Sequence, residues 1–305
     1  MNNVISTKVE IFRNLKDFKF EPKLNEVNKQ EIVQILTNAL KGKMSLLTLN
    51  QAEGSVFKHL KANDLIIDST KDIFVGKKDR VAINMFTGEH IAIVSTCEGF
   101  KKQAITSAVE ISNILSNKVA FAYNDEFGYL TSDLNNIGTG IKIESNIMLS
   151  AITKINKIEQ VKQNLSKLGY LLKETKYPAV YLLTTKCSLG ISEKKIFEDF
   201  ENTLIKLQEL EIESVKMLDT TNHDEMLDKV NRSVAILNSA HLLTYDELFN
   251  IVVNLRMGVN LGLADYEAET LNKLQKLITS KTNDMVAQSE LKELASNAKA
   301  ILKGE

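Results

Sequence analysis

The chain has 305 residues, of which 44% are hydrophobic and 25% charged, and its formal net charge is −1. These values are typical of a soluble globular protein with a substantial core and room for two domains. A nearly neutral chain has no general electrostatic attraction to nucleic acid or to an acidic membrane. No apolar run reaches transmembrane length, and the first ten residues contain no signal-peptide core. We therefore expect neither a nucleic acid nor a membrane as partner.

The cysteines and histidines point to a reducing compartment without a metal site. The two cysteines, Cys97 and Cys187, form neither a disulfide framework nor a metal-binding signature. The four histidines are scattered through the chain and lack the spacing of metal ligands. The sequence therefore predicts a cytoplasmic protein that holds no metal through its own residues.

The first 116 residues alternate between predicted strands and helices. Apolar periodicity predicts a strand over Val4–Ile11 and an amphipathic helix over Asn25–Leu40. Two strands, Arg80–Met85 and His90–Ser95, flank a Thr87-Gly88 turn and form a predicted hairpin. Residues 103–116 carry apolar side chains at helical spacing and predict a second helix.

Residues 119–140 predict a strand, a turn at Gly128, a second strand and a Gly-Thr-Gly loop at 138–140. Further elements follow as a helix to about Ile152, a helix over Ile158–Leu168, strands over Tyr170–Lys173 and Ala179–Leu183, and a helix from Ser192 to about Glu213.

Residues 215–305 show helical periods only. Thr244 and Glu247 form a capping box, in which a hydroxyl and a carboxylate satisfy N–H groups at a helix start. No linker rich in glycine or proline precedes this part, so we expect it to pack on the preceding residues. The predicted fold class is α+β: an antiparallel sheet flanked by helices over residues 1–214, then an all-helical domain over residues 215–305.

Four segments resemble the ATP:guanidino phosphotransferases, above all their bacterial branch, the protein-arginine kinases. These segments are Ile5–Leu15, residues 119–140, Ser188-Leu-Gly-Ile-Ser-Glu193, and the pair Asp228–Ser233 and Leu255–Gly262 in the helical part. The last pair resembles a tail that the small-metabolite kinases lack. The resemblance implies a guanidino-kinase fold, Mg-ATP as cofactor, and arginines and carboxylates that bind phosphate and guanidinium groups.

Several positions that the resemblance assigns to phosphate binding are altered. Lys8 and Glu10 stand where the family has arginines, and Glu10 inverts the charge beside a triphosphate. Two like charges about 4 Å apart repel by about 4 kcal/mol at an effective dielectric constant of 20. Arg13 follows on the same predicted strand but faces the other way, so it does not substitute. Lys101, Lys142 and Lys173 replace further arginines, and His59 matches a histidine near the nucleotide base.

The acidic positions are altered as well. The family's carboxylate loop falls on residues 95–101, where Thr96 and Cys97 replace the acidic pair and only Glu98 keeps an acid. Asp133 replaces a cysteine that touches the guanidinium, although a role in satisfying turn N–H groups is the simpler interpretation. Glu98 and Asp133 are therefore the candidate catalytic acids.

Two regions with glycines or arginines in the family lack them here. The phosphate loop is several residues short at residues 173–178 and contains no glycine, so backbone N–H groups lose their close approach to phosphate. The expected phosphoarginine pocket falls on Glu290–Ala295, which supplies acids and no arginine.

Three functions are consistent with this pattern. The first is a protein that has lost phosphotransfer and acts by binding. The resemblance implies a zinc-finger activator, a stress-response repressor or the AAA+ unfoldase of the Clp protease as its partner, and a homodimer through the helical domain. The second is an active, diverged protein-arginine kinase that uses Glu98 or Asp133. The third is a nucleotide or anion sensor that binds ATP through His59 and the lysines without transfer.

Overall fold

The computed structural model describes residues 3–49, 54–76, 80–279 and 288–303. Its centre is an eight-stranded sheet with the order β2-β3-β4-β5-β1-β8-β10-β9, in which every neighbouring pair is antiparallel. The strands are β1 (Val4–Arg13), β2 (Met44–Thr48), β3 (Asp72–Gly76), β4 (Val81–Met85), β5 (Ile91–Glu98), β8 (Ile141–Met148), β9 (Tyr170–Glu174) and β10 (Val180–Thr185), and a separate small sheet holds β6 (Tyr123–Asn124) and β7 (Gly128–Tyr129).

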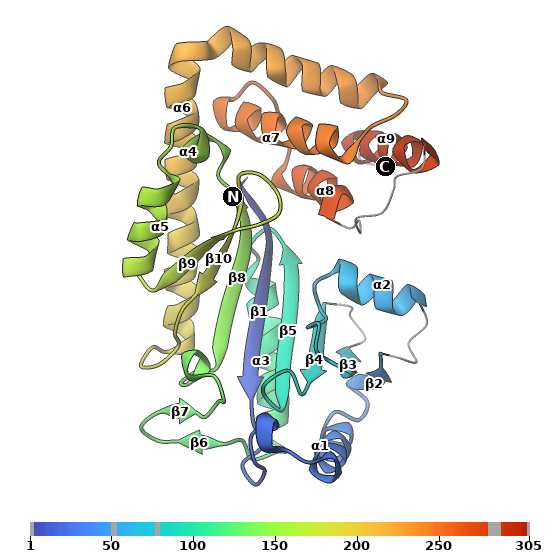
Figure 1. The fold of residues 1–305 in the computed structure, drawn as a ribbon, viewed down its shortest axis with the longest axis vertical. Coiled ribbons are helices and arrows are strands. Elements are labelled where there is room, and N and C mark those ends of the chain that lie inside the picture. Colours follow the sequence, from blue (N-terminus) through green and yellow to red (C-terminus); the bar gives the residue numbers. More distant parts are fainter. Residues whose placement is uncertain (1–2, 50–53, 77–79, 280–287, 304–305) are drawn as a thin grey trace.

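Helices flank the sheet and form the C-terminal part of the molecule (Figure 1). They are α1 (Glu26–Ala39), α2 (Gly54–Ala62), α3 (Lys102–Ser116), α4 (Ser150–Lys154), α5 (Ile158–Lys167), α6 (Glu193–Ser239), α7 (Tyr245–Leu261), α8 (Ala268–Thr279) and α9 (Gln288–Lys303), with short 3-10 turns η1 (Glu21–Lys23) and η2 (Leu134–Asn136). The predicted α+β class, with its all-helical C-terminal region, is confirmed.

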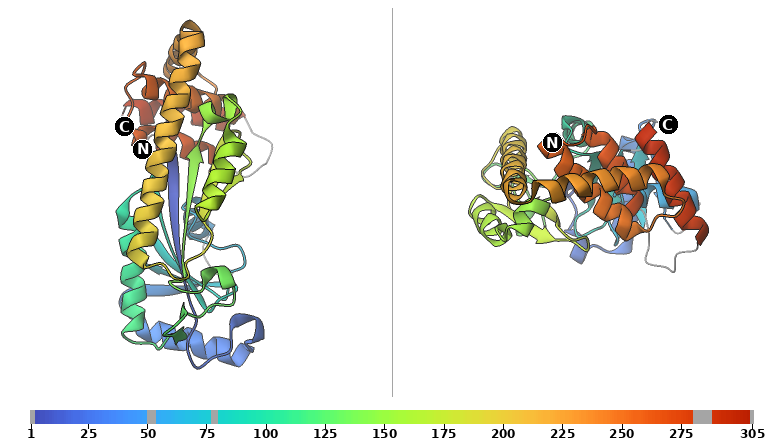
Figure 2. Two further views of the ribbon diagram at one scale, coloured as in Figure 1. Left: turned by 90° about the vertical axis from the view of Figure 1, so that its left-hand side faces the viewer. Right: turned by 90° about the horizontal axis from the view of Figure 1, so that it is seen from above.

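One face of the sheet is covered by helices and forms the main core. On β1, Val9 and Ile11 are fully buried and point to this face, where they join apolar residues of α3 and of the first half of α6. Figure 2 shows α3 and α6 running along the same side of the sheet. Because side chains alternate along a strand, Lys8 and Glu10 point to the opposite face. That second face is partly open and carries the candidate site.

The structure corrects the prediction of a helix up to Ile152. Residues 141–148 form β8, which lies between β1 and β10, and only the short helix α4 follows. Ile141, Ile143 and Ile147 are buried at alternate positions, which is the pattern of a half-buried strand. Polar residues lie between these isoleucines, and the sequence alone did not distinguish this alternation from a helical pattern. Residues 119–140 hold only the two-residue strands β6 and β7, and the turn between them covers residues 125–127, just before Gly128. The remaining predicted strands and helices of residues 1–185 occur close to their predicted bounds.

The structure also corrects the length of the helix that begins after Ser192. It continues as α6 to Ser239, with non-helical backbone angles at Asn222 that mark a kink. The predicted domain boundary after residue 214 falls inside this helix and stays a prediction. Thr244 accepts a hydrogen bond from the Glu247 N–H (3.2 Å), as the capping box predicts.

The helical part packs directly on the end of the sheet, as expected from the missing linker. A cluster of buried apolar residues joins Ile5 of β1 and Val180 of β10 to α7, α8 and α9. The chain's start therefore lies against the C-terminal helices (Figure 1). Within the described residues, none of the helices combines the length and apolar character needed to cross a bilayer.

Glu211 of α6 gives this junction a pH-sensitive contact. Its carboxylate is 3% exposed and accepts hydrogen bonds from the N–H groups of Ala151 (2.8 Å) and Ile152 (3.1 Å) at the start of α4. Burial raises the pKa of Glu211 to about 7, and the backbone donors oppose this shift only in part. The folded state therefore holds a proton that the unfolded chain releases near pH 4.5.

We predict that Glu211 lowers the stability of the protein as the pH rises from 4.5 to 7. The folded pKa lies above the unfolded one, so the unfolded state binds fewer protons in this window and gains relative to the folded state. Glu211→Gln removes this decline, which amounts to about 3 kcal/mol, as urea unfolding at several pH values will measure. The control Glu209→Gln changes an exposed residue of the same helix. Identical pH profiles for both variants would contradict the prediction.

Candidate functional site

Two cavities lie along the open side of the sheet. The first has a volume of about 480 Å³ and lies between β1, β5, β8, the end of α2 and helix α8. The second has about 940 Å³ and lies beside the start of β8, the strands β9 and β10, and the loop at residues 132–136. Lys8 lines the first cavity and Lys142 lines the second. The residues around these two lysines decide what the site binds.

Four charged side chains form a closed ring between the two cavities, which we call the charge ring: Lys8, Glu10, Lys142 and Glu144. Lys8 Nζ lies 3.0 Å from Glu10 and 3.1 Å from Glu144, and Lys142 Nζ lies 3.4 Å from Glu10 and 2.7 Å from Glu144. The strand register produces this arrangement, because Lys8 pairs with Glu144 and Glu10 with Lys142 across β1 and β8. Each lysine thus has a carboxylate on either side.

The ring contains two cationic and two acidic side chains, and the pKa values of Lys8, Lys142 and Glu144 are shifted towards their ionised forms. Burial lowers the pKa of Lys8 and of Lys142, but Glu10 and Glu144 outweigh it, and both pKa values lie above their usual range. Burial raises the pKa of Glu144, but Lys8 and Lys142 outweigh it, and the net shift is downward. Two lysines and two glutamates give the ring no net formal charge.

The charge ring disfavours the binding of phosphate by Lys8 and Lys142. A phosphate group that bound Lys8 would have to displace Glu10 or Glu144 and would then lie beside that carboxylate. Like charges at about 4 Å repel by about 4 kcal/mol at an effective dielectric constant of 20. Glu10 is 4% exposed, so it has little room to turn away into solvent.

The other predicted nucleotide-binding residues do not form one cluster. Lys101 is exposed in front of α3 and lines the first cavity, whereas Lys173 is exposed on β9 and lines the second. His59 is exposed on α2, where its carbonyl and ring contact the side chain of Asn63, and it lines neither cavity. The five predicted residues are therefore split between two cavities and an outer helix.

The turn at residues 175–179 is closed by hydrogen bonds among its own residues and Val180. The Thr175 N–H and hydroxyl both donate to the carbonyl of Val180, at 3.3 and 2.9 Å. The Tyr177 N–H donates to the Thr175 hydroxyl (3.2 Å). Where the resemblance implies a phosphate-binding glycine loop, the chain has a compact turn in which the N–H groups of Thr175 and Tyr177 have internal partners.

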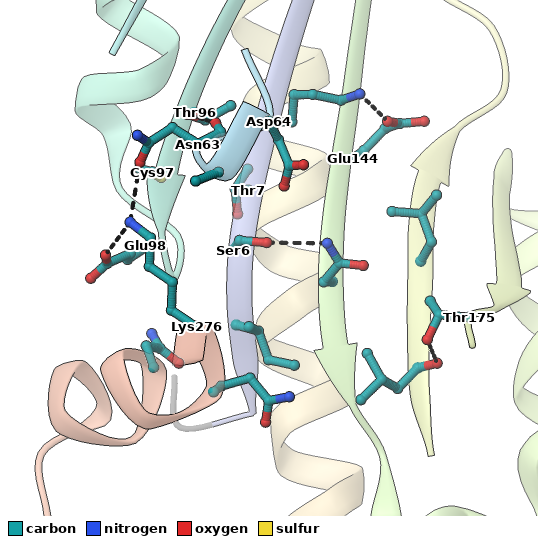
Figure 3. A pocket seen from close by; sticks show the side chains of 18 of the residues that line it. Ser6, Thr7, Asn63, Asp64, Thr96, Cys97, Glu98, Glu144, Thr175 and Lys276 are labelled. Carbon is teal, nitrogen blue, oxygen red and sulfur yellow. Dashed lines mark hydrogen bonds and ion pairs between the residues drawn. The ribbon is translucent and has the colours of Figure 1, made fainter. Parts of the chain in front are cut away.

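The carboxylate loop lacks an acidic pair in space as well as in sequence. The Thr96 hydroxyl donates to the carbonyl of Asn63 (2.8 Å). Cys97 points into the main core, where burial raises the pKa of its thiol. Glu98 lines the first cavity, but its carboxylate lies 3.4 Å from Lys276 of α8 (Figure 3).

Asp133 has the role of a turn residue. Its carboxylate accepts hydrogen bonds from the N–H (3.0 Å) and side-chain amide (2.9 Å) of Asn135, at the start of η2. Asp133 lines the second cavity and Glu98 the first, so the two candidate acids face different spaces. The structure thus favours the simpler interpretation of Asp133.

Arg13 supports the Gly-Thr-Gly loop from behind the site. It is 1% exposed, and Nη1 donates to the carbonyls of Phe12 and Thr139, both at 2.8 Å. Its guanidinium carbon lies 3.5 Å from the ring centre of Tyr129. A Cβ atom at Gly140 would lie 2.6 Å from Arg13 Nη1, and φ there is 65°, so this position requires glycine.

Sequence reasoning missed three acids of the first cavity, Asp64, Glu144 and Glu269. Asp64 follows α2 with a φ of 52° and is an exposed residue. Desolvation of its carboxyl by the surrounding cavity raises its pKa, and Lys8 and Lys276 oppose the shift. Glu144 matches an uncharged family position, so the resemblance gave no signal for it. Lysine and glutamate stand two positions apart at Lys8 and Glu10, and again at Lys142 and Glu144. A prediction that these two segments pair as antiparallel strands would have brought the four side chains together.

Mg-ATP does not fit the residues present. The lysines at the centre of the sheet have carboxylate partners, and the turn at 175–179 contains no glycine. The other two predicted lysines, Lys101 and Lys173, line different cavities. Within the described parts of the chain, no group of three or more acidic, histidine or cysteine side chains is placed to hold a metal ion.

Two family models match the chain. The model of the ATP:guanido phosphotransferase C-terminal catalytic domain matches residues 15–214, and the model of the protein-arginine kinase McsB C-terminal domain matches residues 223–304.

Curated relatives carry the name protein-arginine kinase. That of Clostridium botulinum is 28% identical over 96% of this chain and 91% of its own length. That of Clostridium acetobutylicum is 24% identical over 98% of this chain and 94% of its own length.

Solved structures share the fold. The duplicated taurocyamine kinase of Schistosoma mansoni has a TM-score of 0.61 and 20% identity, over 69% of this chain and 33% of that longer chain. A lombricine kinase has a TM-score of 0.61 and 18% identity, over 68% of this chain and 66% of that chain.

We predict that Arg13→Lys destabilises the protein by about 2 kcal/mol. Lysine lacks the planar guanidinium that stacks on Tyr129 while it donates to two carbonyls. Urea unfolding will measure the loss. Arg232→Lys is the control, because Arg232 is an exposed arginine paired with Asp228 on the same helix, and its replacement costs less than about 0.5 kcal/mol. Equal effects of the two changes would show that Arg13 does not support the loop.

Proposed function

The chain belongs to the ATP:guanido phosphotransferase family, and we propose that it is a protein-arginine-kinase-like protein that has lost, or nearly lost, phosphotransfer and acts by binding proteins. The observation that carries this proposal is the charge ring of Lys8, Glu10, Lys142 and Glu144. Phosphoryl transfer depends almost entirely on positioned positive charge around the phosphates. In the charge ring, both lysines are paired with glutamates, so their positive charge is not available to a phosphate group.

The acidic side of the chemistry supports the same proposal. A guanidinium has a pKa above roughly 12, so its activation needs a carboxylate placed to accept a proton. Thr96 and Cys97 supply no carboxylate, Glu98 is paired with Lys276, and Asp133 caps a turn. The retained framework and the altered reactive positions together favour binding over catalysis.

The proposed partners follow from family membership. We propose a role in Clp-type stress response or proteolysis in the cytoplasm, with a zinc-finger activator, a repressor or an AAA+ unfoldase as partner. Self-association through the helical domain is part of the same proposal. The long helix α6 and the helices α7–α9 supply the large helical surface that such contacts need.

One observation favours a second candidate, an active but diverged protein-arginine kinase. Asp64, Glu98 and Glu144 line the same cavity as Lys8 and Lys101, so acids and bases do meet on one open space. The raised pKa of Asp64 is a property that a proton acceptor needs. Glu98 and Asp64 are the acids that this candidate would use, in place of Asp133.

We predict that the protein forms no phosphoarginine on an unfolded, arginine-rich protein substrate in the presence of Mg-ATP. The reason is the missing phosphate clamp. Mass spectrometry of the substrate, beside a reaction with an active protein-arginine kinase, will measure the product. Phosphoarginine that accumulates well above a reaction without enzyme would overturn the proposal and favour the second candidate.

The second candidate makes its own prediction about the first cavity. If transfer occurs there, Asp64→Asn and Glu98→Gln each lower kcat by about a hundredfold or more, because each removes a proton acceptor. Asp133→Asn is the control, since Asp133 lines the other cavity. Activity that survives both changes would exclude these acids from the chemistry.

A further inference from the structure

The first cavity contains a cation that the protein itself supplies. Lys276 of α8 lies 3.4 Å from a Glu98 carboxylate oxygen and donates to the side-chain oxygen of Asn63 (3.1 Å). Figure 3 shows this side chain reaching from the helix towards Glu98 and Asn63. We propose that Lys276 is an internal occupant of the cavity, which keeps cationic side chains of a partner out until α8 moves. This inference rests on the proposed binding function.

The chemistry of the contact supports occupancy. Glu98 is the one acid within residues 95–101, and a carboxylate next to an amide oxygen is a suitable acceptor pair for an ammonium or guanidinium group. An external cation and Lys276 therefore compete for the same two acceptors.

The position of α8 makes the contact a link between the two parts of the molecule. Asn272 and Gln275 of this helix also line the cavity, whereas Glu98 belongs to the sheet and Asn63 follows α2. A movement of α8 would withdraw Lys276 and widen the space at the same time. The helical part can thus control access to the sheet.

Gln275 gives the cavity an unused hydrogen-bonding group. It is 0% exposed, and among the described residues neither its amide nitrogen nor its amide oxygen has a partner. A buried polar group without a partner is unfavourable and gains from a ligand that supplies one. An amide-containing ligand that entered beside α8 would meet this group one residue from Lys276.

The contact is weak enough to open. The side chains of Lys276 and Glu98 are 40% and 35% exposed, so solvent screens their attraction. Exposed ion pairs contribute up to about 1 kcal/mol, which corresponds to about fivefold in an equilibrium constant. A partner that presents a cation needs only a modest additional affinity to displace Lys276.

The test is a titration with N-acetyl-arginine amide, followed by NMR shifts of the cavity residues. We expect Lys276→Met to bind this cation about fivefold more tightly than the unaltered protein. The uncharged analogue N-acetyl-citrulline amide should gain nothing from the change. Lys292→Met, which removes an exposed lysine of α9, is the matched control and should leave the affinity unchanged.

Two outcomes would overturn the inference. One is an affinity of Lys276→Met no higher than that of Lys292→Met, and the other is an equal gain for the citrulline analogue. Hydrogen exchange is a second readout, in which residues 268–279 should exchange faster in Lys276→Met than in Lys292→Met. Equal exchange in these two variants would count against a link through Lys276. Neither readout requires phosphotransfer, so failure here is distinct from failure of the proposed function.

Discussion

The pairing of Lys8 and Lys142 with Glu10 and Glu144 is the interaction on which the interpretation of this molecule depends. Antiparallel register places the four side chains on one face of β1 and β8, and alternating charge along both strands closes the ring. A sheet of this family with arginines at such positions attracts phosphate. In this sheet lysine and glutamate alternate, and each of the four charged side chains has oppositely charged partners within the ring.

The framework around the ring is intact, which explains how the fold tolerates the altered site. Arg13 holds the Gly-Thr-Gly loop, and Glu89 accepts hydrogen bonds from the N–H groups of Ser132 (2.7 and 2.9 Å) and Asp133 (3.1 Å) in the preceding loop. Both residues are almost fully buried. Their contacts serve the backbone and do not depend on a reactive group. Residues that hold the backbone of this segment can therefore stay the same while neighbouring residues that would take part in the chemistry change.

Much of this arrangement could be predicted from local sequence. Asn25 caps α1, the Thr87-Gly88 turn connects β4 to β5, and apolar periods give α3 and α5. The family resemblance alone indicated that Thr96 and Cys97 replace an acidic pair. These features depend on residues close together in the chain.

Features that depend on distant residues were missed. The helix predicted before Ile152 is a strand because β1 and β10 supply pairing partners for residues 141–148. Glu144 and Asp64 became visible as site residues only when β8 and the end of α2 met at Lys8. The contact of Lys276 with Glu98 spans 178 positions, so no local pattern indicates it.

The most direct measurement of the central claim is a calorimetric titration with Mg-ATP of the unaltered protein and of Glu10→Gln/Glu144→Gln. Neutral amides free both lysines for phosphate without changing side-chain size. We expect no saturable heat for the unaltered protein at millimolar nucleotide and measurable binding by the double variant. Saturable binding by the unaltered protein that the double change leaves the same or weakens would contradict it.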